Sequence, residues 1–309
     1  MPQDPLAEET GIPMIQRQIA GYDGTMLHYR IRRSGPRWLV IANGYAGTFL
    51  EWKSLLPRLD PRLSILMWDY RGTYRSAVPN DRSHLTILDD SLDLDAIVET
   101  EGIDRFVLMG WSVGVQVALE QYRQHPERIE ALILHNGSPE RVLHNVLDGN
   151  LAPRLFEPIT GLLAKVGNLF HPVRRVLHLT ATARLLEVMG VVVRHEPHFR
   201  EAVRSVAELD LDVYFTMVME ADRHRTNSMW HQVHVPTLIT YGKRDFITPE
   251  RVARALHRSI AGSRLAALPG GHYSLMEYPE LLATNIGKFL DQLGAPTESG
   301  HAPLKYPPH

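Results

Sequence analysis

One serine of this chain stands in a pattern that suits nucleophilic chemistry, the segment Gly110-Trp111-Ser112-Val113-Gly114. An apolar run at residues 106–109, which predicts a buried strand, comes before it, and a helical pattern at residues 115–120 follows. At such a strand–turn–helix corner the serine hydroxyl is pushed out of the sheet, and the glycines let the two backbones approach each other. The start of the helix adds free N–H groups where a negatively charged oxygen would form. The pattern therefore predicts that Ser112 is a catalytic nucleophile.

A serine hydroxyl needs a base before it can attack, and His272 is the best placed of the sixteen histidines. It lies in the segment Pro269-Gly270-Gly271-His272-Tyr273, after a predicted strand at residues 263–268 and before the last predicted helix. The two glycines allow a loop to carry the imidazole over the edge of a sheet. We therefore expect His272 to be the base.

The base needs a carboxylate that fixes its tautomer and stabilises its charged form. Asp245 follows a predicted strand at residues 237–241 and precedes a predicted helix, which Thr248-Pro249 can cap and start. A competing position at the end of an earlier strand offers Asn136, with no carboxylate before Glu140. The sequence therefore predicts Asp245 as the acid.

Apolar runs and helical stretches alternate along most of the chain, and these elements would position the three residues. Residues 14–33 predict two strands around an Asp23-Gly24 turn. Near-continuous apolar strands interleaved with helices are typical of a parallel sheet that is covered on both faces. The further predicted strands are 38–42, 63–68, 106–109, 131–134, 237–241 and 263–268, and the predicted helices are 50–59, 84–101, 112–125, 249–260 and 275–293.

The alternation stops after the fourth of these apolar runs and returns about a hundred residues later. The intervening stretch shows helical patterns and no clear buried strand. We predict one α/β core, built from residues 1–137 and 235–293, and a helical cap over residues 138–234. Residues 294–309 are polar and proline-rich and are expected to be disordered.

The chain order Ser112, Asp245, His272, with the elements around each residue, resembles the α/β-hydrolase superfamily. The resemblance covers about residues 14–293 and is to the branch that has a helical cap after the sixth strand. It implies an eight-stranded, mostly parallel sheet covered by helices, with a Ser-His-Asp triad at the carboxyl ends of the strands.

Residues 42–47, Ala-Asn-Gly-Tyr-Ala-Gly, stand where this family usually carries a His-Gly-x oxyanion loop after the third strand. Carried over by position, the backbone N–H of Tyr45 would be one oxyanion donor and the N–H of Val113 the other. Asn43 stands where the family usually has histidine.

Residues 69–76, Asp-Tyr-Arg-Gly-Thr-Tyr-Arg-Ser, resemble the family's Asp-x-Arg-Gly-x-Gly-x-Ser segment after the fourth strand, with Tyr74 in place of the second glycine. This loop is structural in the family, which implies scaffold roles for Asp69 and Arg71. The same resemblance assigns the nucleophile elbow around Ser112 to Gly110, Trp111 and Gly114.

Composition excludes several other classes of protein. The chain has 33 Lys+Arg and 35 Asp+Glu, a formal net charge of −2, and no cysteine. The charge balance argues against a general nucleic-acid binder, and the missing cysteines exclude disulfides, thiol catalysis and Cys-ligated zinc.

Eight histidines lie within residues 139–234, but a proline between His195 and His198 prevents the two histidines from sharing one face of a regular helix. We therefore expect no metal, and the chemistry requires no organic cofactor.

The amino-terminal residues are acidic and carry no apolar stretch behind a basic start, so they do not resemble a secretory signal. The strongest apolar cluster, residues 188–193, is far shorter than the roughly 18 residues that a membrane span needs. We expect a cytoplasmic protein without a membrane span, whose partner is a small-molecule acyl substrate. The oligomeric state stays open.

Together these features predict a carboxylesterase-like serine hydrolase, which cleaves carboxylic esters or related acyl bonds through an acyl-enzyme. The same triad also serves lactonases, C–C bond hydrolases, amidases or aminopeptidases, thioesterases, cofactor-free haloperoxidases and acyltransferases. A ligand receptor on the same fold, with slow turnover, is an alternative of a different class. The sequence leaves open the substrate and its chain length, the choice between hydrolysis and acyl transfer, and the conformation of the cap.

Overall fold

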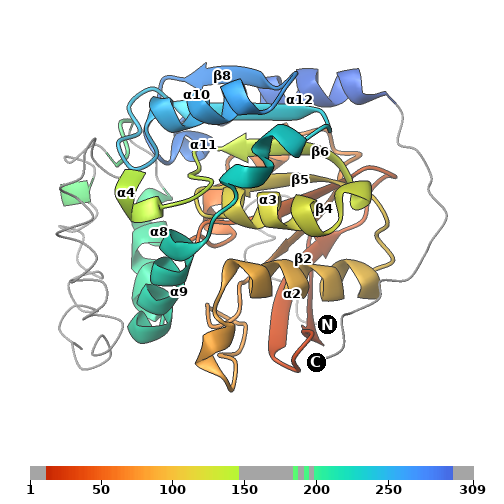
Figure 1. Ribbon diagram of the computed structural model, residues 1–309, viewed down its shortest axis with the longest axis vertical. Helices are drawn as coiled ribbons and strands as arrows, with labels where there is room; N and C mark the ends of the chain where they lie inside the picture. Colours follow the sequence, from red (N-terminus) through yellow and green to blue (C-terminus); the bar gives the residue numbers. More distant parts are fainter. Residues whose placement is uncertain (1–11, 146–183, 187–190, 195–197, 295–309) are drawn as a thin grey trace.

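The computed structural model describes residues 12–145, 184–186, 191–194 and 198–294, which form an eight-stranded sheet with helices packed against it (Figure 1). The strands are β1 (Ile15–Ala20), β2 (Met26–Arg32), β3 (Trp38–Ala42), β4 (Ser64–Trp68), β5 (Phe106–Trp111), β6 (Ile129–His135), β7 (Thr237–Gly242) and β8 (Arg264–Leu268). They lie in the order β1-β2-β4-β3-β5-β6-β7-β8. β2 is antiparallel to both of its neighbours, β1 and β4. All other neighbouring strands in this order are parallel to each other. The predicted, mostly parallel sheet is confirmed.

Successive side chains of the central strands point to opposite faces of the sheet and fill two separate apolar cores. On β3, for example, Val40 belongs to one core, whereas its neighbours Leu39 and Ile41 belong to the other. Because these strands are buried on both faces, almost every residue in them is apolar. This is why the strands could be found from apolar runs alone.

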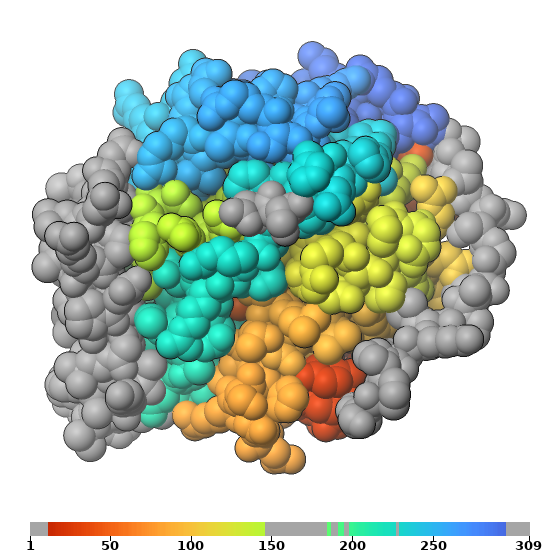
Figure 2. All heavy atoms as spheres, viewed as in Figure 1, coloured from red at the N-terminus to blue at the C-terminus, as the bar shows by residue number. Residues whose placement is uncertain are grey.

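Helices cover both faces of the sheet. The core that contains Val40 also includes residues of α2 (Ile87–Thr100), α3 (Gly114–Gln124) and α10 (Glu250–Ser259), and these helices lie on the face seen in Figures 1 and 2. The other core includes residues of α11 (Ser274–Glu277) and α12 (Pro279–Leu290). Among the described residues no helix is both long enough and apolar enough to cross a membrane.

Two predicted helices differ from the observed structure. Residues 50–59 form two short 3₁₀ turns, Leu50–Trp52 and Leu56–Arg58, and not one helix. Pro57 lies in the second turn and has no N–H to donate, so a continuous helix cannot form there. The helix predicted at 275–293 is divided into α11, α12 and a final turn, Asp291–Leu293, and α12 begins at a proline.

Between β6 and β7 the described residues form helices and contain no strand. These helices are α4 (Val142–Asn145), α8 (Phe199–Ser205) and α9 (Leu211–Arg223). α9 shares the core of the sheet, since Val213 and Met217 lie in the same apolar cluster as Val40. Its contact with the sheet loops is close, because a Cβ on Gly72 would lie 2.5 Å from Val213 Cγ1.

Figure 2 shows α9 in turquoise alongside the orange segment that leads into α2. The division of the chain at residues 138 and 234 stays a prediction. The tail predicted at 294–309 lies, apart from Gly294, outside the described residues.

Candidate active site

Ser112 directly follows β5, in the middle of the sheet, and stands just before α3. Its φ is +57°, in the left-handed region that favours glycine, as the tight strand–helix corner requires. A Cβ on Gly110 would lie 2.3 Å from the Gly114 carbonyl oxygen, and a Cβ on Gly114 would lie 2.0 Å from the Ala42 carbonyl oxygen. The two glycines are therefore needed for α3 to approach β5 and β3 so closely.

Three loops that follow β5, β7 and β8 bring the predicted nucleophile, acid and base together. His272 Nε2 lies 3.0 Å from Ser112 Oγ, and His272 Nδ1 lies 2.9 Å from Asp245 Oδ2. The imidazole and the carboxylate are buried, whereas Ser112 is half-buried. A hydroxyl, an imidazole and a carboxylate in such a chain can activate the hydroxyl as a nucleophile.

The loop after β7 holds Asp245 with several hydrogen bonds. Asp245 Oδ1 accepts from the N–H groups of Ile247 and Thr248 at 2.8 and 2.9 Å, and Oδ2 accepts from the Thr248 hydroxyl at 2.6 Å. The prediction that Thr248 caps α10 is wrong, because α10 begins after Pro249 with no side-chain cap and the hydroxyl serves the carboxylate instead.

Electrostatics keep this carboxylate charged. Burial raises the pKa of Asp245, but the charge of His272 and the hydrogen bonds from His272 and Thr248 outweigh burial, so that the pKa lies below its ordinary value. A charged Asp245 accepts a hydrogen bond from the Nδ1–H of His272 at 2.9 Å. This bond leaves Nε2 of the imidazole facing the Ser112 hydroxyl.

A second histidine, His135, lies near His272 and stays neutral. It is buried at the end of β6, with Nδ1 2.7 Å from Thr240 Oγ1. Burial, followed by the positive charge of His272, lowers the pKa of His135 to about 3. A neutral His135 therefore adds no positive charge beside His272.

Of the two predicted oxyanion donors, Val113 directly follows Ser112, and Tyr45 directly follows Gly44. Gly44 is in contact with the serine, since a Cβ there would lie 3.2 Å from Ser112 Cβ. The Gly47 N–H donates to the Gly44 carbonyl at 2.8 Å and closes a turn that contains Tyr45. Neither the Tyr45 N–H nor the Val113 N–H has a hydrogen-bond acceptor among the described residues. Two free amides beside a serine hydroxyl can bind a negatively charged oxygen.

Asn43 fixes this turn without the histidine that is usual in the family. Its Oδ1 accepts from the Gly44 N–H and from Trp52 Nε1, both at 3.1 Å, and its Nδ2 donates to the Thr48 carbonyl at 3.0 Å. The Tyr70 phenol donates to the Asn43 carbonyl at 2.8 Å. The residues before and after the turn are thus held by side chains of the core.

Asn136 fixes the loops of His272 and Asp245 relative to each other, a role that the sequence did not predict. Its Nδ2 donates to the Gly271 and His272 carbonyls at 2.9 and 2.8 Å, and its Oδ1 accepts from the Gly242 N–H at 2.7 Å. Asn136 is buried and has a φ of +40°. It therefore connects the loop of His272 to the end of β7, three residues before Asp245. The only sequence signal was an Asn-Gly pair at the end of a buried strand.

Glu277 connects the loop of His272 to the insertion, by which we mean the described residues between β6 and β7. Its Oε2 accepts from the Gly271 N–H at 2.7 Å, and its Oε1 accepts from the N–H groups of Val193 and Arg194 at 2.5 and 2.6 Å. An apolar cluster makes a second connection, in which residues of the insertion pack against the neighbours of the acid and the base. Its members are Val191, Val192, Phe199 and Val203, packed against Phe246, Ile247 and Tyr273.

The loop of residues 69–76 makes buried ion pairs. The Arg71 guanidinium is fully buried and donates to Asp93 at 2.8 and 2.5 Å and to Asp23 at 3.0 Å. Asp69 accepts from His28 Nδ1 at 2.8 Å. These contacts agree with the scaffold roles that the family resemblance implies.

No group of three or more metal-ligating side chains occurs among the residues that the structure describes. Of the two histidines considered as ligands, His195 lies outside the described residues. The other, His198, has its Nδ1 3.8 Å from a carboxylate oxygen of Glu201.

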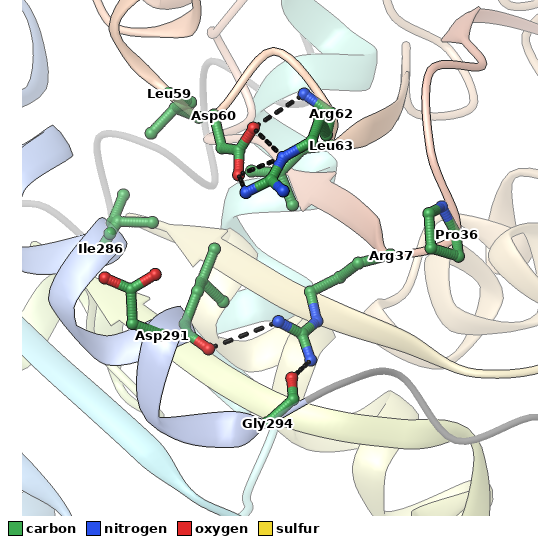
Figure 3. A pocket seen from close by; sticks show the side chains of 11 residues that line it. Pro36, Arg37, Leu59, Asp60, Arg62, Leu63, Ile286, Asp291 and Gly294 are labelled. Carbon is green, nitrogen blue, oxygen red and sulfur yellow. Dashed lines mark hydrogen bonds and ion pairs between the residues drawn. The ribbon is translucent and has the colours of Figure 1, made fainter.

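A pocket of about 320 Å³, shown in Figure 3, lies at the end of the parallel strands that is opposite to Ser112. It is lined by Arg37, which precedes β3, so it lies at the amino ends of the parallel strands, whereas Ser112 follows the carboxyl end of β5. Within it, Arg37 is paired with Glu130 at 2.7 Å, and Arg62 is paired with Asp60 at 2.7 Å. The arginines of this pocket are thus engaged within the protein, and the pocket is not part of the candidate active site.

Comparisons with known proteins agree with the fold. Residues 37–279 match the family model described as the alpha/beta hydrolase fold. The chain is 26% identical over 235 residues to a proline iminopeptidase from Neisseria meningitidis serogroup B, covering 67% of this chain and 74% of that protein. It is 25% identical over 278 residues to a pimeloyl-[acyl-carrier protein] methyl ester esterase from Yersinia enterocolitica, covering 86% of this chain and 98% of the esterase.

A solved structure gives the same result for the fold. The enol-lactonase from Burkholderia xenovorans LB400 superposes with a TM-score of 0.71 at 21% identity, over 89% of this chain and 100% of that one. The family model spans most of the chain, and the fold of this chain agrees with that of the solved structure. The chain is a hydrolase that belongs to the α/β-hydrolase family.

Proposed function

We propose that this protein is a serine hydrolase that cleaves carboxylic esters, or related acyl bonds, through an acyl-enzyme on Ser112. The observation that carries the proposal is the continuous hydrogen-bond chain from Ser112 Oγ to His272 Nε2 at 3.0 Å and from His272 Nδ1 to Asp245 Oδ2 at 2.9 Å. The N–H groups of Tyr45 and Val113, which have no acceptor in the described part of the chain, support it, because they supply the donors that an oxyanion needs.

In this reaction Ser112 Oγ attacks the carbonyl carbon of the ester while His272 Nε2 takes the hydroxyl proton. The carbonyl oxygen becomes negatively charged and accepts hydrogen bonds from the Tyr45 and Val113 amides. Asp245 stabilises the imidazolium through its bond to Nδ1. The imidazolium gives its proton to the leaving alcohol, and the acyl group stays on Ser112. A water molecule then gives a proton to His272 and attacks the acyl carbon. The bond from that carbon to Ser112 Oγ breaks, the imidazolium returns its proton to Oγ, and the carboxylic acid leaves.

Hydrolysis of p-nitrophenyl acetate tests the proposal. We expect turnover by the wild type and a loss of at least roughly 10⁴-fold in Ser112→Ala, because triad residues act as a unit. Ser83→Ala is the matched control, since the Ser83 hydroxyl also makes a side-chain hydrogen bond, to Asp81 at 2.8 Å, and is exposed before α2. Equal rates for the wild type and Ser112→Ala would overturn the proposal.

Labelling gives a second test that needs no knowledge of the natural substrate. An alkyl fluorophosphonate should modify Ser112 in the wild type, as located by peptide mass spectrometry, and should not label Asp245→Asn at a comparable rate. A label on another serine contradicts the assignment. Full labelling of Ser112 without turnover of any tested substrate would instead indicate a slow ligand receptor.

Amide substrates form the second candidate class, because one relative is a proline iminopeptidase. The same nucleophile, base and oxyanion donors would act on an amide bond. Prolyl p-nitroanilide should therefore be assayed beside p-nitrophenyl acetate, each with the Ser112→Ala control. A higher kcat/KM for the anilide would replace the ester proposal by an aminopeptidase.

A further inference from the structure

Tyr74 departs from the motif of its family, since it occupies the second glycine position of the Asp-x-Arg-Gly-x-Gly-x-Ser segment. Its φ is +45°, in the left-handed region that favours glycine. A tyrosine in this conformation is strained, and the surrounding structure must hold it there.

The backbone on both sides of Tyr74 is fixed. The Thr73 N–H donates to the Tyr70 carbonyl at 3.0 Å, and the Ser76 N–H donates to the Thr73 carbonyl at 2.9 Å. The Ser76 hydroxyl donates to the Asp69 carbonyl at 2.6 Å, which ties the loop to the end of β4. A fixed backbone fixes the Cα–Cβ bond from which the phenol extends, and the hydrogen bond of the phenol then sets its direction.

The phenol reaches the turn that contains Tyr45. Its hydroxyl donates to the Ala46 carbonyl at 2.7 Å. The same peptide group, between Ala46 and Gly47, donates its N–H to the Gly44 carbonyl at 2.8 Å and so closes the turn. Tyr74 therefore holds the peptide on which the conformation of the turn depends.

The phenol also lies where the insertion meets the loop of the base. Ser205, the last residue of α8, lies beside the phenol oxygen, and Tyr214 and Tyr273 are close enough to interact with it electrostatically. Burial, followed by the negative charge of Glu51, raises the pKa of Tyr74 above its ordinary value. The phenol therefore keeps its proton and remains a hydrogen-bond donor.

We propose that Tyr74 is a positioning residue for the oxyanion turn, residues 44–47: its hydroxyl holds the Ala46 carbonyl and keeps the Tyr45 N–H directed at the substrate oxygen. The inference rests on the proposed function, since it assigns a role within that same site. The effect is greatest when the substrate oxygen is charged, that is, in the transition state. Loss of the hydroxyl should therefore lower kcat and leave KM nearly unchanged.

Two variants separate this role from a purely structural one. Tyr74→Phe removes the hydroxyl and keeps the ring, and Tyr74→Gly restores the residue that is usual in the family and removes the backbone strain. Tyr122→Phe is the matched control, because the Tyr122 phenol also donates to a backbone carbonyl, that of Gln232 at 3.3 Å. The readouts are kcat and KM for p-nitrophenyl acetate, the rate of fluorophosphonate labelling of Ser112, and the thermal unfolding midpoint.

We expect Tyr74→Phe to lower kcat and the labelling rate roughly 10-fold, less than the roughly 10²–10³-fold loss when an oxyanion donor is deleted. Tyr74→Gly should lose at least as much activity although its backbone is relaxed, and Tyr122→Phe should match the wild type. Wild-type kcat in Tyr74→Gly, or a loss confined to KM, would overturn the inference. Those results would leave the proposed function intact, whereas wild-type activity that does not depend on Ser112 would refute the proposed function itself.

Discussion

Replacement of Asp245 by asparagine tests the role of the acid with almost no change of shape. In Asp245→Asn the N–H groups of Ile247 and Thr248 keep an oxygen at the Oδ1 position, so the amide nitrogen must take the Oδ2 position. That position lies 2.9 Å from His272 Nδ1, to which the amide N–H would donate a hydrogen bond. The imidazole then carries its own proton on Nε2, and it can no longer accept the proton of Ser112.

The expected loss follows from this change of tautomer. A triad with the wrong tautomer loses about 10⁴-fold in kcat, which corresponds to about 5.4 kcal/mol at about 1.36 kcal/mol for each factor of ten. The free energy of unfolding should change much less. The variant loses a hydrogen bond to a charged carboxylate, worth about 1.5–3 kcal/mol, but it also removes the cost of burying that carboxylate.

The assay is kcat/KM for p-nitrophenyl acetate, with Ser112→Ala as the baseline. Asp81→Asn is the control, because Asp81 Oδ1 accepts from the N–H two residues later, that of Ser83 at 2.9 Å, just as Asp245 does from Ile247. Since Asp81 lies on the surface, this control should retain wild-type activity. If Asp245→Asn keeps more than a tenth of the wild-type value while Ser112→Ala is inactive, the argument from the tautomer is refuted.

Three further changes test other parts of the structure. The free energy of unfolding measured in urea should be about 0.5–1 kcal/mol higher for Ser112→Gly than for Ser112→Ala, because only glycine is free of strain at this positive φ. Equal free energies of unfolding for the two variants would contradict that strain. Asn136→Asp should destabilise the protein by about 3 kcal/mol at pH 8 and by less at pH 5, since a charged carboxylate cannot donate to the His272 carbonyl; a variant with wild-type urea midpoint and kcat would exclude this role. Burial raises the pKa of Asp90 well above its ordinary value, so the unfolded chain releases this proton above about pH 4 whereas the folded chain retains it. Stability is therefore lost as the pH rises, and Asp90→Asn should gain stability relative to the wild type between pH 5 and pH 8; an unchanged difference would contradict the raised pKa.

Most of the sheet could be predicted because its sequence signal is local. A strand that is buried on both faces must be apolar at nearly every position, as at Val40 and its neighbours, so the pattern appears without knowledge of any partner. The segment at 50–59 also has helical spacing, but Pro57 prevents the helix, and burial in the second core accounts for the apolar residues instead.

The meeting of Ser112, Asp245 and His272 could be predicted because each of them lies at a junction whose form depends on nearby glycines and strand ends. The residues that hold them in register could not be predicted in this way. Asn136 and Glu277 act on partners that are far away in sequence, up to 138 and 84 residues distant. In the sequence such residues look like an ordinary turn asparagine and an ordinary helix glutamate. Their roles follow only from the order in which the strands assemble.

The order of the strands has a consequence for how the protein would lose activity. Ser112 follows β5, which is hydrogen-bonded on both sides, whereas His272 follows β8, the outermost strand, which is bonded to β7 alone. Four of the five residues of β8 keep part of their surface in water, and outer strands of this kind open with less free energy than central ones. In mild denaturant His272 would therefore separate from Ser112 while the centre of the sheet stays folded. Activity would then be lost before the sheet unfolds. A molecule with a native circular dichroism spectrum would already be inactive.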